Sequence, residues 1–184
     1  MVERRLDMLL RFARSLRDPW VLGQLALFAL VGGGVQLAGD RLAGPPAPGS
    51  RPAALTLMIL ATLLILAASQ GLGRSLTPTV VPVVDGQLVT HGLYAWLRHP
   101  IYLAVILMLT GMALLSGRWW AGLLVAPLAY AYFDRKAAVE ERLLEARYPE
   151  YAAYRARVGK LLPRLSPASP EAGRSCHPGR RRSR

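Results

Sequence analysis

Residues 88–102 (LVTHGLYAWLRHPIY) bring two histidines, an arginine and three aromatic residues into one short segment. The dipeptide His99-Pro100 predicts a helix that begins at Pro100, because proline is favoured in a first helical turn and disfavours helix in the preceding residue. The N–H groups of a first turn have no intrahelical partner and attract carboxylate or phosphate. Arg98 would add a fixed cation beside them. The spacing therefore indicates an anion site, for which lipid phosphates are an equally good ligand.

Three aromatic residues of this segment, Tyr94, Trp96 and Tyr102, could stack on a purine base or face a cation. The alternative is an interfacial belt, in which aromatic rings lie at the level of the lipid headgroups. His91 and His99 are not expected to bind a metal ion, because no cysteine, third histidine or carboxylate lies near them at ligand spacing.

A pair of carboxylates, Glu140 and Glu141, follows the last apolar run of the chain by less than two turns. Lys136 precedes Glu140 by four residues, which is the spacing of a solvated ion pair on a helix surface. The functional alternative is that one carboxylate turns back toward the apolar helices and binds the amine of a ligand.

Four apolar runs position these residues: 20–37, 53–71, 101–116 and 119–133. At about 1.5 Å per residue, the first nearly crosses a hydrocarbon core of roughly 30 Å, while the third is short for a full span. Runs three and four are separated only by a tight break, and Pro127 predicts a kink in run four. We expect an all-α integral membrane bundle of about four transmembrane helices, with the third and fourth as a helical hairpin.

Composition separates apolar from basic residues along the chain. Hydrophobic residues make up 53% of the sequence, yet the formal net charge is +12. The arginines flank the apolar runs instead of alternating with exposed aromatics, so membrane lipids with anionic headgroups are the expected partner and nucleic acid is not. The single Cys176 excludes a disulfide framework within the chain.

The remaining segments are polar or irregular. Residues 1–18 carry five arginines and predict either an interfacial amphipathic helix or a basic anchor before the first run. Proline and glycine predict a loop at 39–52 and extended or turning backbone at 72–87. The glycines of 32–34 suit a close approach between membrane helices. Charged amphipathic helices are expected from Asp134 onward.

The distribution of lysine and arginine predicts the orientation in the membrane. If four spans put both termini on one side, that side receives five of these residues from 1–18, two from 72–99 and thirteen after Asp134. The opposite side receives only Arg41, Arg51 and Arg118. Twenty against three is a strong positive-inside signal, so both termini and the residues discussed above are expected on the cytoplasmic side.

The ordered set G-x-Y-x-x-x-R-H-P-x-Y (92–102), Gly111, DRKAAVEERLL (134–144) and PEYAAYRARVGKLLPRL (149–165) resembles the isoprenylcysteine carboxyl methyltransferase family. That family belongs to a wider group of membrane methyltransferases that includes phospholipid N-methyltransferases. The resemblance covers residues 72–165. It implies a methyltransferase that binds S-adenosylmethionine at the cytoplasmic membrane surface.

The resemblance also assigns residues. The matching cofactor positions are Gly86, Gln87, Leu88, Val89, Tyr94, His99, Pro100, Ile101, Tyr102 and Glu140. The helix start and His99 suit the cofactor's carboxylate, Glu140 suits its ammonium, and Tyr94 or Trp96 could cover its rings. Arg98 is the candidate catalytic residue, which would orient an anionic acceptor near the methyl group.

Two departures from the family concern the acceptor and not the cofactor. A substrate-binding arginine of the family corresponds here to Lys136, with Arg135 adjacent, so the charge is kept without the bidentate fork. A family glutamine corresponds to Thr79. Arg135 and Lys136 are therefore the expected substrate-binding residues, for a lipophilic acceptor such as an isoprenyl-thioether carboxylate or a related small lipid.

The expected divisions are a basic segment (1–18), one membrane domain (19–165) whose cofactor-binding half is 72–165, and a disordered basic tail (166–184). Two other functions stay open. Membrane sterol reductases share a related R-H-P-x-Y half and use NADPH, although this chain lacks their additional spans. The third possibility is a non-enzymatic membrane protein whose site has lost its function. Against it, the sequence keeps the full set of candidate residues: Tyr94, Arg98, His99, Pro100 and Glu140.

Overall fold

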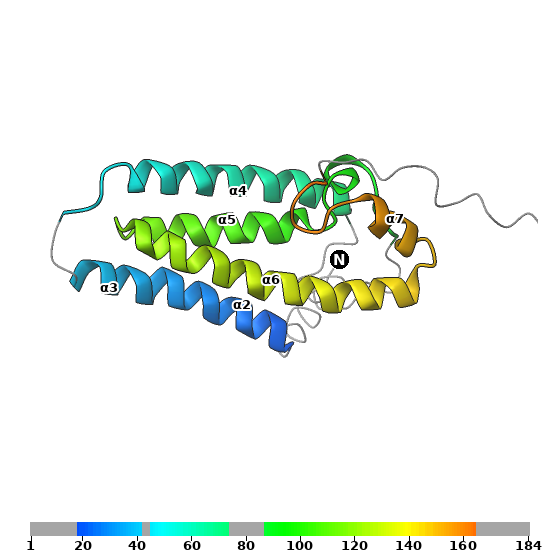
Figure 1. Ribbon diagram of the computed structural model, residues 1–184, viewed down its shortest axis with the longest axis horizontal. Helices are drawn as coiled ribbons and strands as arrows, with labels where there is room; N and C mark the ends of the chain where they lie inside the picture. The colour runs from blue at the N-terminus through cyan, green and yellow to red at the C-terminus, as the bar shows by residue number, and fades with distance from the viewer. Residues whose placement is uncertain (1–17, 42–44, 74–86, 165–184) are drawn as a thin grey trace, which may run out of the picture.

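The computed structural model describes residues 18–41, 45–73 and 87–164, and these residues are helical (Figure 1). The elements are α2 (Pro19–Ala29), η1 (Leu30–Val35), α3 (Gln36–Arg41), α4 (Ser50–Leu72), η3 (Gly92–Ala95), α5 (Pro100–Leu114), α6 (Trp119–Arg147) and α7 (Tyr151–Arg157). Within the described ranges no strand forms, and Leu97 and Gly159 make one isolated parallel bridge. The all-α prediction is confirmed for this part of the chain.

Several predicted segments lie outside the described residues. They are the basic segment 1–18 apart from Asp18, most of the extended segment 72–87, and the tail 166–184. Gly86 and Thr79 fall in the same undescribed parts of the chain.

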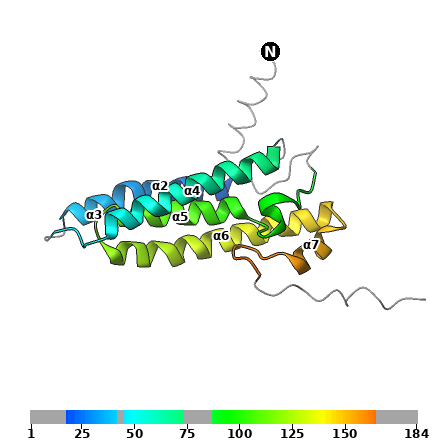
Figure 2. The same cartoon turned by 90° about the horizontal axis from the view of Figure 1, so that it is seen from above.

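The long helices run along one common axis, as two perpendicular views show (Figures 1 and 2). In Figure 1, α4 forms one side of the bundle, α2 and α3 form the other, and α5 and α6 lie between them. One end of the bundle carries η3, α7 and the start of α5, and the opposite end carries the turn between α5 and α6. The polar residues of the predicted site therefore gather at one end.

The first apolar run forms α2, a π-helical turn (η1) and α3 in succession. Asp18 begins α2, because its side chain accepts a hydrogen bond from the Trp20 N–H at 2.8 Å and Pro19 takes the first helical position. Of the glycines at 32–34, Gly32 lies near another helix, 3.1 Å separating the position of a Cβ from Met112. Nothing lies within 4 Å of that position at Gly33, so the predicted close approach holds for one glycine of the run.

Helices α4 and α5 pack through small residues. Ala54, Ala61 and Ala68 recur every seven residues on α4 and are fully buried. On α5, a Cβ at Gly111 would lie 2.9 Å from the Ala54 carbonyl oxygen and 2.7 Å from the Met58 side chain. Small residues let the two backbones approach closely, which is how helices associate where lipid offers no hydrophobic driving force.

Helices α5 and α6 form the predicted helical hairpin. The turn between them contains Gly117, whose φ of 77° lies in the left-handed region that glycine adopts without strain. Helix α6 then continues without interruption from Trp119 to Arg147 and includes Pro127. The fourth apolar run and the charged segment after Asp134 are therefore one helix, so the bundle is joined rigidly to the polar end.

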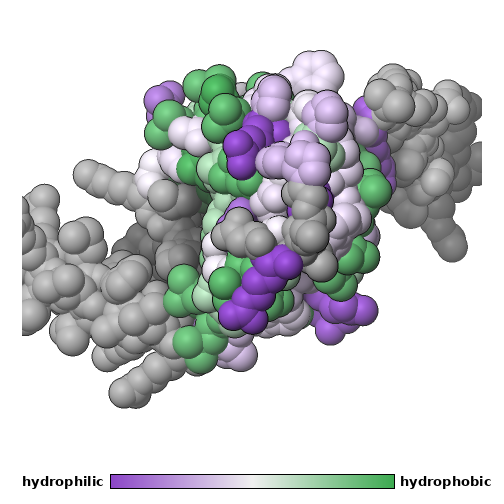
Figure 3. Space-filling view, turned by 90° about the vertical axis from the view of Figure 1, so that its left-hand side faces the viewer, coloured by the Kyte–Doolittle hydropathy of each residue, from purple (hydrophilic) through white to green (hydrophobic). Residues whose placement is uncertain are grey.

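Many leucine and isoleucine side chains remain exposed on the outer faces of the bundle. They are Leu22, Leu25, Leu30, Leu37, Leu55, Ile59, Leu60, Leu63, Leu66, Leu123, Leu124 and Leu128. Seen along the bundle, hydrophobic residues lie around much of its margin and hydrophilic ones form a few separate patches (Figure 3). Two helical stretches, Pro19–Gly39 and Ser50–Leu72, are long and apolar enough to cross a membrane by length and composition, and α5 is shorter. The count of four spans stays a prediction.

Replacing Gly111 with alanine is expected to destabilise the protein by about 1–3 kcal/mol, because the added methyl group overlaps the α4 backbone. The measurement is thermal unfolding in detergent. Gly33→Ala is the matched control, since no atom lies within 4 Å of its Cβ position. Equal unfolding temperatures for the two variants would contradict the close packing of α4 and α5.

Candidate functional site

The start of α5 pairs with the segment that follows α7. The Arg98 N–H donates to the Gly159 carbonyl at 2.8 Å, and the His99 N–H donates to the Lys160 carbonyl at 3.1 Å. Leu97 and Gly159 form the parallel bridge beside them. Lys160 is itself held on α6, because its Nζ donates to Asp134 Oδ1 at 2.6 Å. The helix start predicted at Pro100 is thus confirmed, and residues 158–160 fix the turn that precedes it.

Arg98 connects three parts of the structure. Its Nε donates to Glu141 Oε1 on α6 at 2.8 Å, and its Nη1 donates to the carbonyls of Arg155 and Val158 at 2.8 and 2.5 Å. These carbonyls belong to the end of α7, where backbone oxygens lack intrahelical donors. The Arg98 side chain is only 7% exposed. Its described contacts hold the turn before α5 to α6 and α7, and its predicted role toward an acceptor stays a prediction.

Glu141 is a buried carboxylate held by two side chains from the opposite turn. Its Oε1 accepts from Arg98 Nε at 2.8 Å and lies 3.1 Å from His99 Nε2, while Arg155 Nε lies 3.7 Å from Oε2. Burial alone would raise the pKa of this carboxyl. The hydrogen bond from His99 and the charge of Arg98 together outweigh burial and lower the pKa from 4.5 to about 2. Glu141 is therefore ionised at neutral pH.

Glu140, the neighbour of Glu141, faces the first turn of α5. Its Oε2 accepts a hydrogen bond from the Tyr102 hydroxyl at 2.6 Å and lies 3.7 Å from His99 Nδ1. The His99 and Tyr102 rings stack with an interplanar angle of 2°. About one quarter of the Glu140 side chain is exposed, against 5% for Glu141. The structure thus brings His99, Tyr102 and Glu140 together, as the resemblance implied.

Lys136 is buried, so it is not the solvated surface residue that its spacing with Glu140 suggested, although the two charges still interact. Its Nζ donates to Gln24 Oε1 on α2 at 2.8 Å and lies 5.2 Å from the centre of the Tyr102 ring. Arg135, the other predicted substrate-binding residue, is exposed. The two basic residues therefore have different surroundings. Arg135 faces the exterior, and only Lys136 contacts the residues around Glu140.

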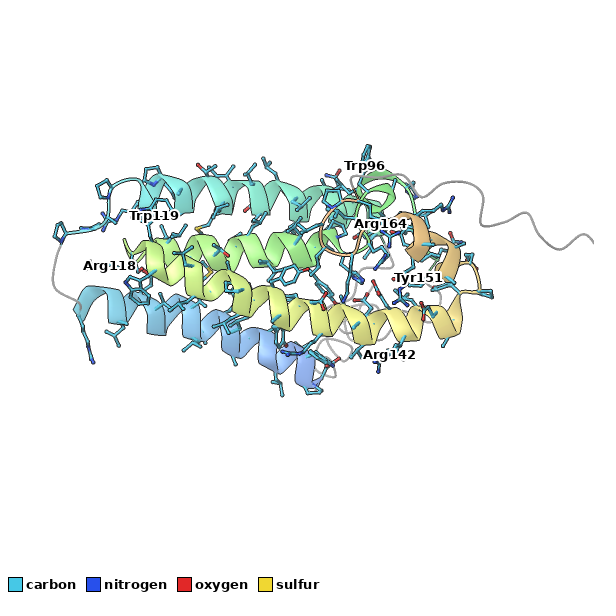
Figure 4. The ribbon with its side chains drawn as sticks, viewed as in Figure 1. Trp96, Arg118, Trp119, Arg142, Tyr151 and Arg164 are labelled. Atoms are coloured by element: carbon cyan, nitrogen blue, oxygen red, sulfur yellow. The ribbon has the colours of Figure 1, made fainter. Side chains whose placement is uncertain are left out.

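The predicted aromatic residues Tyr94 and Trp96 also differ in burial. Tyr94 is buried against Gly71 at the end of α4, and its carbonyl accepts from the Tyr154 hydroxyl at 2.6 Å. Burial, helped by the charge of Glu140, raises the pKa of the Tyr94 hydroxyl well above its ordinary value. Trp96 is 70% exposed and stands at the outer margin of the bundle (Figure 4). A role for Trp96 in covering the cofactor's rings is not favoured by this exposure.

The other predicted cofactor positions lie at the same end, except that Gly86 is outside the described residues. Gln87 is exposed and Val89 is half-buried, while Leu88 packs against Tyr151, Tyr154 and Val158. Pro100 is fully buried, and Ile101 packs against the bundle core. The segment before η3 is thus positioned by α7.

Three residues of the site could not be singled out from the sequence. Glu141 was recognised only as one of a pair, and no pattern indicates which carboxylate is buried. Gln24 lies in an apolar run 112 residues from Lys136. Tyr151 lies between α7 and α6 (Figure 4), and its buried hydroxyl has no hydrogen-bond partner among the described residues. Within these residues there is also no group of three metal-binding side chains.

Comparison with known proteins identifies relatives of the same part of the chain. The profile of the phospholipid methyltransferase family matches residues 50–151. Protein-S-isoprenylcysteine O-methyltransferase of Schizosaccharomyces pombe is 31% identical over 80 residues, which are 43% of this chain and 34% of the relative. The cobalt-zinc-cadmium resistance protein CzcN of Cupriavidus metallidurans is 34% identical over 83 residues, 45% of this chain and 38% of the relative. The matches thus span little more than a third of each curated relative.

A solved structure shares the fold. The structure of the eukaryotic intramembrane Ras methyltransferase ICMT (isoprenylcysteine carboxyl methyltransferase) aligns with a TM-score of 0.57 and 26% identity, over 61% of this chain and 42% of that one. The family match contains Arg98, His99, Tyr102 and both glutamates, whereas Gln24 and the segment 158–160 lie outside it.

The pH dependence of stability should depend on Glu141. Its pKa is lowered in the folded protein, so its contribution is complete above about pH 4.5 and is lost as the pH falls to about 2. In Glu141→Gln, the fall in unfolding free energy over that range should shrink by on the order of 3 kcal/mol. Denaturant unfolding at several pH values measures this. Glu145→Gln, an exposed carboxylate one turn later, should keep the wild-type slope, and a wild-type slope in Glu141→Gln would refute the assignment.

Proposed function

This chain belongs to the phospholipid methyltransferase family, in the same group of membrane methyltransferases as the isoprenylcysteine carboxyl methyltransferases. On that premise we propose that it transfers a methyl group from S-adenosylmethionine to a lipophilic acceptor. The observation that carries the proposal is the contact of Glu140 with His99 and Tyr102. Glu140 lies about 40 positions after His99 and Tyr102, and the fold brings this α6 residue against the first turn of α5, where complementary charges of a zwitterionic ligand could bind.

The residues at this end of the bundle fit the charges of S-adenosylmethionine. The first-turn N–H groups of α5 suit its carboxylate, and the Glu140 carboxylate suits its ammonium. Bound there, the cofactor would supply a methyl group that an electron-rich acceptor can take by forming a bond to its carbon, while the carbon–sulfur bond breaks and the neutral thioether leaves. The proposed binding residues are Gly86, Gln87, Leu88, Val89, Tyr94, His99, Pro100, Ile101, Tyr102 and Glu140.

For the acceptor we propose an anionic group on a lipid-like tail, such as an isoprenyl-thioether carboxylate. Lys136 supports this class, because its buried Nζ lies beside the Tyr102 ring and adjoins the proposed cofactor site. Arg135 and Arg98 are the other candidates for contact with the acceptor. A carboxylate or thiolate needs no general base, so positioning and electrostatics would supply most of the rate.

We further propose that this end of the bundle faces the cytoplasm. The described residues after Asp134 add eight lysines and arginines at the site end, while the opposite end has Arg41, Arg51 and Arg118. The exposed leucines of α2, α4 and α6 support burial of the bundle in lipid. A site at the membrane surface can receive a soluble cofactor from water and a lipophilic acceptor from the bilayer.

Cofactor binding by the detergent-purified protein tests the proposal. We expect micromolar binding of S-adenosylmethionine by isothermal calorimetry. Glu140→Ala and His99→Ala should lose it, because each substitution removes a polar partner of the proposed site. Glu145→Gln changes a carboxylate on the same helix without touching the site and should bind normally.

Two results would reject this function. Binding of NADPH in place of S-adenosylmethionine would place the protein with the membrane reductases, and binding of neither would indicate a protein without this catalytic activity.

The role of Lys136 can be separated from that of the cofactor site. Lys136→Met keeps the length of the side chain and removes its charge, so it should raise KM for an anionic acceptor about tenfold or more. The affinity for S-adenosylmethionine should stay within a factor of two of the wild type. Radiolabelled methyl transfer to a membrane lipid extract, followed by identification of the product, supplies the acceptor for this assay.

Arg142→Met is the matched control, because Arg142 is an exposed cation on the same helix (Figure 4). An unchanged KM in Lys136→Met, or an equal change in Arg142→Met, would remove Lys136 from the acceptor site.

A further inference from the structure

We propose that Glu141 is a positioning residue that fixes the His99 ring with its Nε2–H donated to the Glu141 carboxylate, so that the His99 Nδ1 lone pair and Glu140 together accept the cofactor's ammonium group. The inference rests on the proposed function and gives the two adjacent glutamates different roles. Glu141 positions the His99 ring, and Glu140 accepts the ammonium group. His99 is likewise assigned to the ammonium instead of the carboxylate that the sequence indicated.

A single hydrogen lies between His99 and Glu141. His99 Nε2 lies 3.1 Å from Glu141 Oε1, so one hydrogen bond joins them. Arg98 lies against the same oxygen at 2.8 Å and keeps the carboxyl ionised at neutral pH. An ionised carboxylate can only accept a hydrogen bond. The hydrogen must therefore be on Nε2 of His99.

The other ring nitrogen of His99, Nδ1, faces Glu140. His99 Nδ1 lies 3.7 Å from Glu140 Oε2, which is too far for a hydrogen bond between them. Glu140 Oε2 instead accepts the Tyr102 hydroxyl at 2.6 Å. The His99 ring stacks on the Tyr102 ring, with centres 5.2 Å apart, so its plane is fixed. Nδ1 and Oε2 are thus two neighbouring acceptors that a group with several N–H donors could share.

The two glutamates differ in how their negative charges are balanced. Glu141 is neutralised by Arg98 and approached by Arg155. The described hydrogen-bond and ring partners of Glu140 are the Tyr102 hydroxyl and the His99 ring, and the charge of Lys136 on the same helix also acts on it. Glu141 is therefore committed to the protein, whereas Glu140 can accept a cationic ligand.

The charged and titratable groups around His99 come from every neighbouring element. They are Arg98 before α5, Tyr102 on α5, Lys136, Glu140 and Glu141 on α6, Tyr151 and Arg155 on α7, and Lys160 after it. An ammonium ligand and a protonated His99 would compete for the same position beside Glu140. With an ammonium bound beside Glu140, Nδ1 of His99 must therefore accept a hydrogen bond and the ring hydrogen must lie on Nε2.

Nitrogen-15 NMR of histidine-labelled protein in nanodiscs tests the state of the ring directly. The chain has three histidines, and the His99 signals are assigned with a His99→Gln variant. We expect one proton-bearing nitrogen, Nε2, and one unprotonated nitrogen, Nδ1. Glu141→Gln should shift both signals toward the average of the two tautomers, and Glu145→Gln should leave them unchanged.

Three ligands identify which cofactor group meets His99. Glu141→Gln should weaken S-adenosylmethionine about tenfold, and should weaken decarboxylated S-adenosylmethionine, which keeps the ammonium, by the same factor. It should not weaken 5′-methylthioadenosine, a neutral thioether that lacks the ammonium, the carboxylate and the sulfonium charge. A merely structural role of Glu141 would weaken all three ligands equally. Unfolding temperatures at neutral pH check that the variant is folded, with Glu141→Asp as the second variant.

The inference is overturned if the loss disappears with the decarboxylated ligand, because His99 would then face the carboxylate. A proton on Nδ1 in the wild type, or equal weakening of all three ligands, also overturns it. If the wild type binds none of the ligands, the proposed function fails, and the NMR spectrum of the ligand-free protein still decides whether Glu141 holds the Nε2–H tautomer.

Discussion

The buried ion pair between Arg98 and Glu141 is the interaction on which the polar end of this protein depends. Taking both charges out of water is costly, and the cost is offset only because each group is fully engaged. Arg98 also donates to two carbonyls at the end of α7, and Glu141 also accepts from His99. Removing either partner would leave an uncompensated buried charge. The pair therefore fixes the start of α5, the C-terminal part of α6 and the end of α7 relative to one another.

The rest of the fold explains why the polar groups meet at one end. Between lipid-facing helices, close backbone approach replaces the hydrophobic effect as the source of association, and the alanines of α4 against Gly111 provide it. On α4 the leucines and isoleucine at 55, 59, 60, 63 and 66 are exposed, while the three alanines that recur every seven residues are buried. Helix α6 then extends from the apolar bundle to Arg147. Its continuous backbone places Lys136 on one turn and Glu140 and Glu141 on the next, beside the start of α5.

Local patterns predicted the elements better than the contacts between them. The proline at position 100, the tight break before Trp119 and the apolar runs correctly gave the helix start, the hairpin and the all-α class. The meeting of Glu140 with His99 and Tyr102 followed only from the family resemblance. The burial of Glu141 and the bond from Lys136 to Gln24 could not be predicted, because periodicity describes one helix and not the angle at which another packs on it. The exposure of Trp96 is a similar case, since spacing alone does not distinguish a stacking ring from a surface ring.

The pairing of Leu97 with Gly159 also determines the order in which the protein can be completed during synthesis. Helices α2 to α6 precede residue 148, so they can pack against one another before the C-terminal segment is synthesised. The turn before α5 acquires its backbone partners only when residues 158–160 emerge. Assembly of the site therefore waits for residues 158–160, and a nascent chain that ends before them would lack these backbone partners.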